Sequence, residues 1–120
     1  MTTTHNIHFS IRLVATALLL AATCLTGKSF ADEVAKFEIV ARDGRLSPEK
    51  LEVPAGVKLR ITLRNEGKTP VEFESQELRI EKIVAGDSAS AVTIQPLKPG
   101  TYQMIDEFRA ETGKIQIIAK

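Results

Sequence analysis

The chain has 120 residues, with 16 basic and 15 acidic side chains and a formal net charge of +1. Balanced charge without a basic cluster indicates neither a nucleic-acid-binding protein nor one that adheres to anionic membrane surfaces. Because His5, His8 and the single cysteine, Cys24, all lie before residue 32, residues 32–120 hold no soft metal ligand except methionine. They also lack the histidine or cysteine of a Ser-His-Asp or Cys-His catalytic set, so we expect no independent enzymatic activity.

The first segment has the pattern of a secretory signal peptide. A weakly basic start ends at Arg12, and the apolar residues 13–22 that follow are too few to cross a bilayer comfortably as a helix. Ser29 and Ala31 place small residues at the −3 and −1 positions of a cleavage site. Export with cleavage before Asp32 is therefore predicted, and an uncleaved N-terminal anchor is the alternative.

With residues 1–31 assigned to the signal peptide, residues 32–120 are expected to form one domain. A chain of this size buries roughly 60–65% of its unfolded surface and builds a single thin core. Its hydrophobic period is close to two, and Gly, Pro or Asn interrupts the short apolar runs. That pattern predicts an all-β sandwich or barrel of short strands. No segment shows sustained helical periodicity.

The first strands are predicted in the N-terminal half of this domain. Residues 37–41 alternate in polarity and end at the breaker residues 42–44 and 47–48. Residues 51–53 form a short strand before a Pro-Ala-Gly turn. Residues 57–64 give the clearest half-buried strand, because four apolar side chains alternate with basic or hydroxyl side chains up to the Asn65 turn.

The C-terminal half continues the same pattern of short strands and turns. Turn residues are expected at 85–87 and 98–100. The further strands are predicted at residues 71–73, 79–84, 91–94, 101–105 and 114–119.

Three motifs occur in the order found in one known family. They are Leu46–Gly56 with the following Leu59–Asn65, then Ile94–Tyr102 with its Pro-Gly-Thr-Tyr turn, and finally Gly113–Ile117. Together they resemble the EfeO-type cupredoxin-like family and span nearly all of residues 32–120. The resemblance implies a cupredoxin-like Greek-key β-sandwich of seven to eight short strands.

The positions that match the copper ligands of such relatives carry other residues. Glutamate stands at the first histidine position within 71–75, Asp106 and Arg109 match the cysteine and second histidine, and Glu111 or Thr112 matches the methionine. With these replacements, the chain resembles a subset of periplasmic cupredoxin-like proteins that are associated with bacterial iron permease systems. It implies two partners, a periplasmic metal-binding protein and a membrane iron permease, with no membrane insertion of the domain itself.

Carboxylates are the ligands that this chain has to offer a metal ion. They suit hard cations such as iron, manganese or calcium, whereas soft copper prefers sulfur, here only Met104. Neighbouring Asp106 and Glu107 would point to opposite faces if extended, and we assign Asp106 to the shared site. The candidate metal ligands are Glu72, Glu74, Glu77, Met104, Asp106 and Glu107.

Plain structural roles compete with metal binding at each of these positions. Glu72 and Glu74 also fit a solvated strand face, Met104 fits a core position, and Arg109 could pair with Glu74 or Asp106.

Two other functions remain open beside a hard-cation carrier. One is a metal-free interaction module with an apolar end patch of Phe73, Phe108 and Met104. The other is a degenerate copper electron carrier that uses Met104 with carboxylates.

Overall fold

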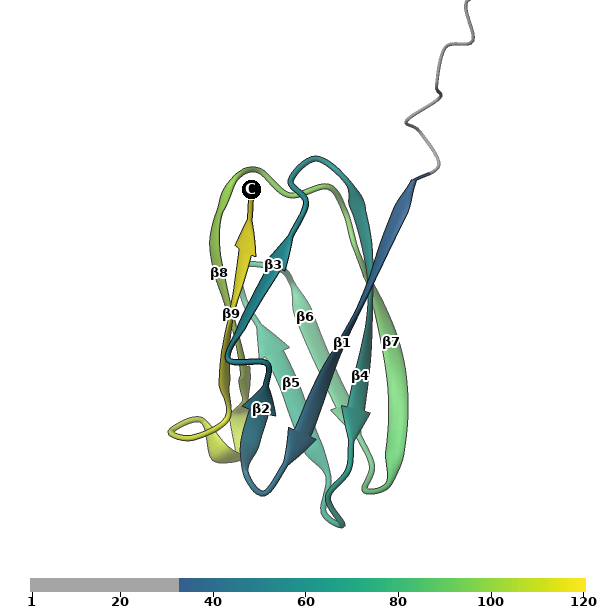
Figure 1. The fold of residues 1–120 in the computed structure, drawn as a ribbon. Helices are drawn as coiled ribbons and strands as arrows, with labels where there is room; N and C mark the ends of the chain where they lie inside the picture. The colour runs from purple at the N-terminus through teal and green to yellow at the C-terminus, as the bar shows by residue number, and fades with distance from the viewer. Residues whose placement is uncertain (1–32) are drawn as a thin grey trace, which may run out of the picture.

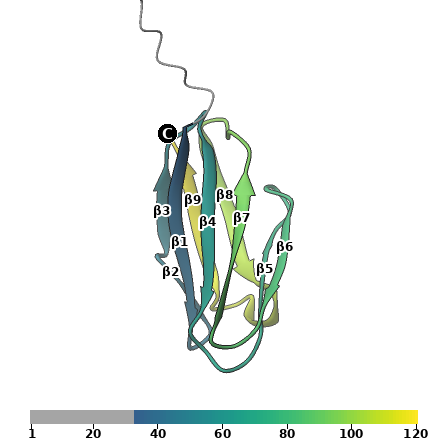
Figure 2. The same ribbon diagram turned by 90° about the vertical axis from the view of Figure 1, so that its right-hand side faces the viewer.

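The computed structural model describes residues 33–120, which form nine strands in two facing sheets (Figures 1 and 2). The predicted signal peptide and its cleavage site lie outside the described residues. The strands are β1 (Val34–Arg42), β2 (Arg45–Ser47), β3 (Lys50–Val53), β4 (Lys58–Asn65), β5 (Val71–Ser75), β6 (Ile80–Val84), β7 (Ser88–Ile94), β8 (Gly100–Asp106) and β9 (Lys114–Ala119). A three-residue 3-10 turn, η2 (Glu107–Arg109), lies between β8 and β9.

Both sheets are mixed. One has the strand order β2-β1-β4-β7 and the other has the order β3-β9-β8-β5-β6. The pairs β1–β4 and β3–β9 are parallel, and the other neighbours are antiparallel. The predicted all-β sandwich is confirmed, and no helix long and apolar enough to span a membrane occurs among residues 33–120.

The structure contains one strand more than the upper bound of eight that was expected. The additional strand, β2, lies between the two predicted groups of breaker residues and includes Ser47, and it pairs with the end of β1. The two strands are joined by Asp43 and Gly44, both with positive φ, as tight hairpin turns require. A strand of three residues is too short to show a hydrophobic period.

The core lies between the sheets and follows the alternation predicted for residues 57–64. Leu59, Ile61 and Leu63 point inward and are completely buried, while Arg60 and Arg64 are exposed. Phe73 of β5 and Ile117 of β9 meet them from the other sheet, and both are also completely buried. Sheet pairing therefore assembles one continuous apolar layer from strands distant in sequence.

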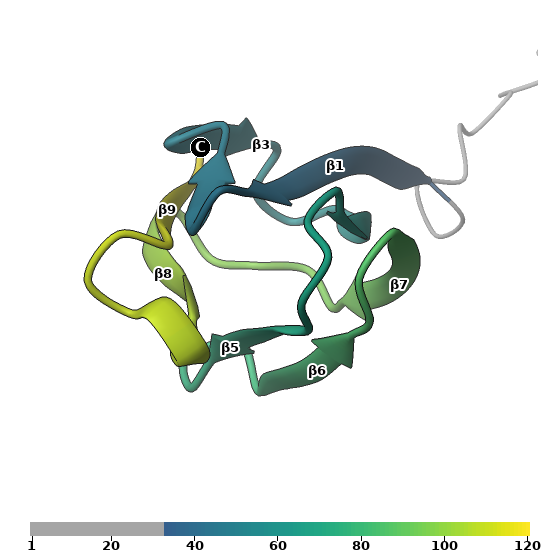
Figure 3. The same ribbon diagram turned by 90° about the horizontal axis from the view of Figure 1, so that it is seen from below.

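A buried asparagine fastens the turn between β4 and β5. Asn65 donates from Nδ2 to the carbonyl oxygens of Thr69 (2.8 Å) and Val84 (3.1 Å), and its Oδ1 accepts from the Gly67 amide (2.9 Å). These bonds tie the turn to the end of β6. The turn reaches the same end of the sandwich as η2 and the β1–β2 hairpin, the end that Figure 3 views from below.

Candidate functional site

Asp106 is the one buried carboxylate among the described residues. It is the last residue of β8, points inward and is 1% exposed. Its Oδ1 accepts hydrogen bonds from the backbone amides of Glu72 (3.3 Å) and Phe108 (3.1 Å), and its Oδ2 lies 3.3 Å from Arg109 Nη1. Both oxygens are therefore occupied by protein donors, and Asp106 also caps the start of η2.

Arg109 covers Asp106 from the solvent side. Its Nη2 donates to Thr69 Oγ1 at 2.7 Å, and an added Cβ on Gly44 would lie 3.2 Å from its Cδ. The predicted pairing of Arg109 with Asp106 is confirmed, through one guanidinium nitrogen. A cation could reach Asp106 only by displacing a guanidinium of like charge, so Asp106 is poorly placed as a metal ligand.

Glu72 and Glu74 lie on the outer face of β5. Their side chains are half-buried, whereas those of Val71, Phe73 and Ser75 between and beside them are buried in the sandwich. This is the strand face predicted by the period of two. The carboxylates of Glu72 and Glu74 thus point away from the interior of the sandwich, into which Asp106 points.

Glu107 lies near Glu72 and Glu74, whereas Asp106, which was assigned to the shared site, points into the sandwich. The pKa of Glu107 is raised from its ordinary value of 4.5, first by a side-chain hydrogen bond with Glu74 and then by the charges of Glu74 and Glu72, with smaller effects of burial and of Glu81. The reason is that β8 ends at Asp106 and the chain turns into η2, so strand alternation does not set the direction of Glu107.

The last carboxylate of the predicted set, Glu77, lies just beyond β5. It is exposed and lines a hollow of about 190 Å³ together with Glu74, Gln103 and Ile105. The outer face therefore gathers four of the six predicted residues around Glu74. Within residues 33–120, no three carboxylates or other metal-binding side chains are already arranged around a common metal position.

Met104 lies apart from these glutamates. It is completely buried in the hydrophobic core, on the inner side of β8. The predicted apolar end patch is also wrong for two of its members, because Phe73 and Met104 are 0% exposed and only Phe108, at 53%, reaches solvent. Both residues stand at positions of β5 and β8 whose side chains point inward, into the core.

Glu81 belongs to the same outer face and is exposed. It lies directly opposite Glu74 in the antiparallel β5–β6 pair. Like charges at opposed positions repel. The sequence pattern alone did not reveal the register of the β5–β6 hairpin. This register follows from the four-residue turn between Ser75 and Ile80.

A blue-copper centre does not fit the described residues. Such a centre needs two imidazoles and a thiolate, and residues 33–120 contain neither histidine nor cysteine. Asp106, which stands at the position matching the cysteine, already accepts hydrogen bonds from two backbone amides and from the guanidinium of Arg109.

Comparison with known proteins places the chain among relatives of similar fold. Uncharacterized protein RP394 of Rickettsia prowazekii is 34% identical over 87 residues, which cover 72% of this chain and 70% of that protein. Auracyanin A, a "blue" copper protein of Chloroflexus aurantiacus, superimposes with a TM-score of 0.63 at 12% identity, covering 73% of this chain and all of auracyanin A.

A second solved structure of similar fold is the metal-binding domain of the Streptococcus pneumoniae Cu(I)-exporting P-type ATPase CopA, determined with Cu(I). Its TM-score is 0.55 at 17% identity, over 73% of this chain and 96% of that domain. At such low identities the two structures establish the fold alone. Residues 14–119 match the sequence family described as "Cupredoxin-like domain". The chain therefore belongs to the cupredoxin-like domain family.

Proposed function

We propose that this protein is an exported, periplasmic accessory protein of a bacterial iron-uptake system. It holds a hard metal cation at outer-face carboxylates and passes it between a periplasmic metal-binding protein and a membrane iron permease. The observation that carries the proposal is the meeting of Glu74 and Glu107, with Glu72 and Glu81 close enough to raise the pKa of Glu107. A cation bound between these carboxylates would offset their mutual repulsion.

The position of these carboxylates favours exchange over storage. Glu72 and Glu74 are half-buried and Glu107 is exposed, so a bound ion would keep part of its water shell. Oxygen ligands favour iron, manganese or calcium over copper. Relatives of this fold include copper proteins, and copper is therefore part of the test.

The proposal is tested by calorimetric titration of the purified protein with Fe(II) under anaerobic conditions, and with Mn(II), Cu(II) and Cu(I). Saturable binding of a hard cation is expected in the wild type and should be lost in the variant Glu74→Gln/Glu107→Gln. The matched control, Glu33→Gln/Glu52→Gln, removes two exposed charges elsewhere and should bind like the wild type. No binding of any hard cation, or equal loss in both variants, would contradict the proposal.

A metal-free docking module is the second candidate, and the ion pair between Asp106 and Arg109 favours it. The guanidinium neutralises the inner carboxylate that would otherwise attract a cation. Two large apolar side chains, Ile83 (59% exposed) and Phe108 (53%), lie in elements next to β5 and could contact a partner. Co-purification with the iron permease that survives Glu74→Gln/Glu107→Gln but not Ile83→Ser/Phe108→Ser would support this candidate over the first.

A further inference from the structure

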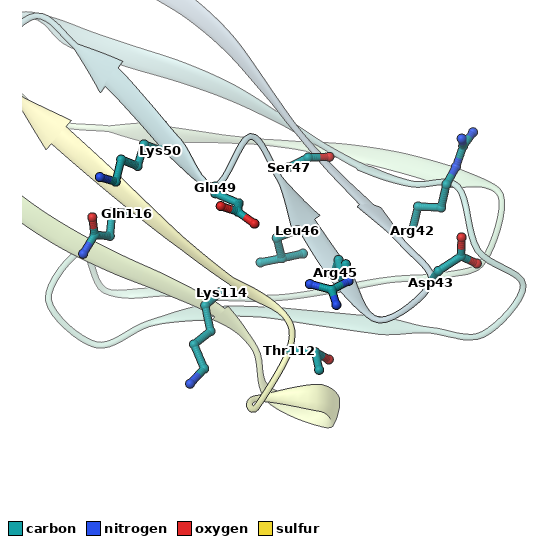
Figure 4. A pocket seen from close by; sticks show the side chains of 10 residues that line it. All are labelled: Arg42, Asp43, Arg45, Leu46, Ser47, Glu49, Lys50, Thr112, Lys114 and Gln116. Atoms are coloured by element: carbon teal, nitrogen blue, oxygen red, sulfur yellow. The ribbon is translucent and has the colours of Figure 1, made fainter.

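A hollow of about 730 Å³, drawn in Figure 4, is lined by none of the glutamates of the outer face. It opens between β2, the start of β3 and the start of β9, with Thr112 from the loop before β9 at one side. Buried Leu46, which is 2% exposed, contributes an apolar surface to it. Its volume lies within the range of about 300–1,000 Å³ that is usual for small-molecule sites.

Basic side chains dominate the charged lining of this hollow. Four are basic, and two, Asp43 and Glu49, are acidic. Arg42 forms an ion pair with Glu66, which does not line the hollow. The other three, Arg45, Lys50 and Lys114, form no ion pair with any residue of the described chain, not even with Glu49 across the same hollow. Three cationic groups are thus left available to a ligand.

These three cations are brought together only by the tertiary fold. Arg45 comes from β2, Lys50 from β3 and Lys114 from β9, and Figure 4 shows all three among the side chains that line the hollow. Gln116 lies beside Lys50, because the two are register partners in the parallel β3–β9 pair, and its amide can donate a hydrogen bond. The Thr112 hydroxyl donates to the Gly44 carbonyl (2.6 Å) and is already used.

We propose that this hollow is a binding site for a small multivalent oxyanion, with phosphate and a polycarboxylate as the two sources of that chemistry. Arg45, Lys50 and Lys114 supply positive charge from three directions, and Gln116 supplies a neutral donor. A guanidinium pairs with two oxygens of one anion, and ammonium groups act as point charges. Glu49 opposes the anion and limits its affinity. The site is independent of the outer-face carboxylates and of the function proposed for them.

The test measures anion binding to the purified full chain by titration calorimetry and by amide chemical shifts, with sodium phosphate or sodium citrate against sodium chloride of equal ionic strength. Saturable binding of one or both multivalent anions is expected. The triple variant Arg45→Gln/Lys50→Gln/Lys114→Gln should weaken it by at least about tenfold. The control Lys36→Gln/Lys58→Gln/Arg60→Gln removes equal charge from the outer face of β1 and β4 and should bind within about twofold of the wild type.

A fourth variant tests the role of the opposing carboxylate. Glu49→Gln should strengthen binding several-fold, a gain that general charge loss or misfolding would not produce. Binding of phosphate but not citrate identifies a phosphate site, and the reverse identifies a polycarboxylate site. Absence of saturable binding for both anions would overturn the proposal. Equal weakening in the two triple variants would overturn it as well, since that result means unspecific attraction.

Discussion

Replacing Asp106 by asparagine is the sharpest test of how the end of the sandwich is held together. The substitution keeps the size of the side chain and one carbonyl oxygen, but removes the charge. The remaining carbonyl oxygen could still accept from the amides of Glu72 and Phe108. The new NH₂ group would face the guanidinium of Arg109, where two donors cannot bond to each other.

The expected loss of stability follows from these contacts. Each of the two amide bonds falls from charge-assisted to neutral strength, at about 1 kcal/mol apiece. The pair with Arg109 contributes about 1 kcal/mol more, because that side chain is 36% exposed and solvent screens the interaction. We therefore expect Asp106→Asn to lower the free energy of unfolding by about 3 kcal/mol. For a domain of this size the melting temperature falls by about 12–24 °C.

Urea and thermal unfolding monitored by circular dichroism measure this effect, with Arg109→Gln as the companion variant. Arg109→Gln should cost only about 1 kcal/mol, because Asp106 keeps its two amide partners. The stability difference between Asp106→Asn and the wild type should be the same with and without a chelator, since both oxygens of Asp106 are held by protein donors. An Asp106→Asn variant within about 0.5 kcal/mol of the wild type would refute the structural role derived for this residue.

Three further predictions concern neighbouring positions. The raised pKa of Glu107 means that the folded state binds this proton more tightly than the unfolded state does. The free energy of unfolding should therefore fall as pH rises above 4.5. Glu107→Gln should remove this part of the pH dependence in denaturation curves. Asn65→Asp should destabilise by about 3 kcal/mol in urea titrations at neutral pH, and by less at pH values that protonate the new carboxyl group, because a carboxylate would face two carbonyl oxygens. Gly113→Ala should cost about 1–3 kcal/mol in thermal melts, since the new Cβ would lie 2.8 Å from Asp106 Cβ. Unchanged stability would contradict the close packing of the loop before β9 against the end of β8.

The strands that follow a clean alternation were predictable from the sequence. Residues 57–64 and 114–119 correspond closely to β4 and β9, because each buries every second side chain against one core. Strand ends were less predictable. The strand predicted at 91–94 begins earlier, at Ser88, where the inner face carries a serine and gives no hydrophobic signal.

The candidate site was predictable only in part. The alternation around Phe73 correctly placed Glu72 and Glu74 on one solvated face. The choice of Asp106 over Glu107 assumed an extended segment, but β8 ends at Asp106 and η2 begins at Glu107, so strand alternation does not apply there. The role of Glu81 depended on the register of β5 with β6, which hydrogen bonds between separate strands decide.

The sequence by itself determined the class of fold and the chemistry that is available. Period-two hydrophobicity dictates a two-layer β-structure, and the lack of histidine and cysteine after residue 32 leaves oxygen as the main ligand atom. Only the tertiary structure decided which charges meet. Strand pairing unites Glu74 with Glu81, η2 turns Glu107 toward them, and the packing of β8 secures Asp106 beneath Arg109. The physical reason is that charges act over a few ångströms in space, and separation along the chain says little about that distance.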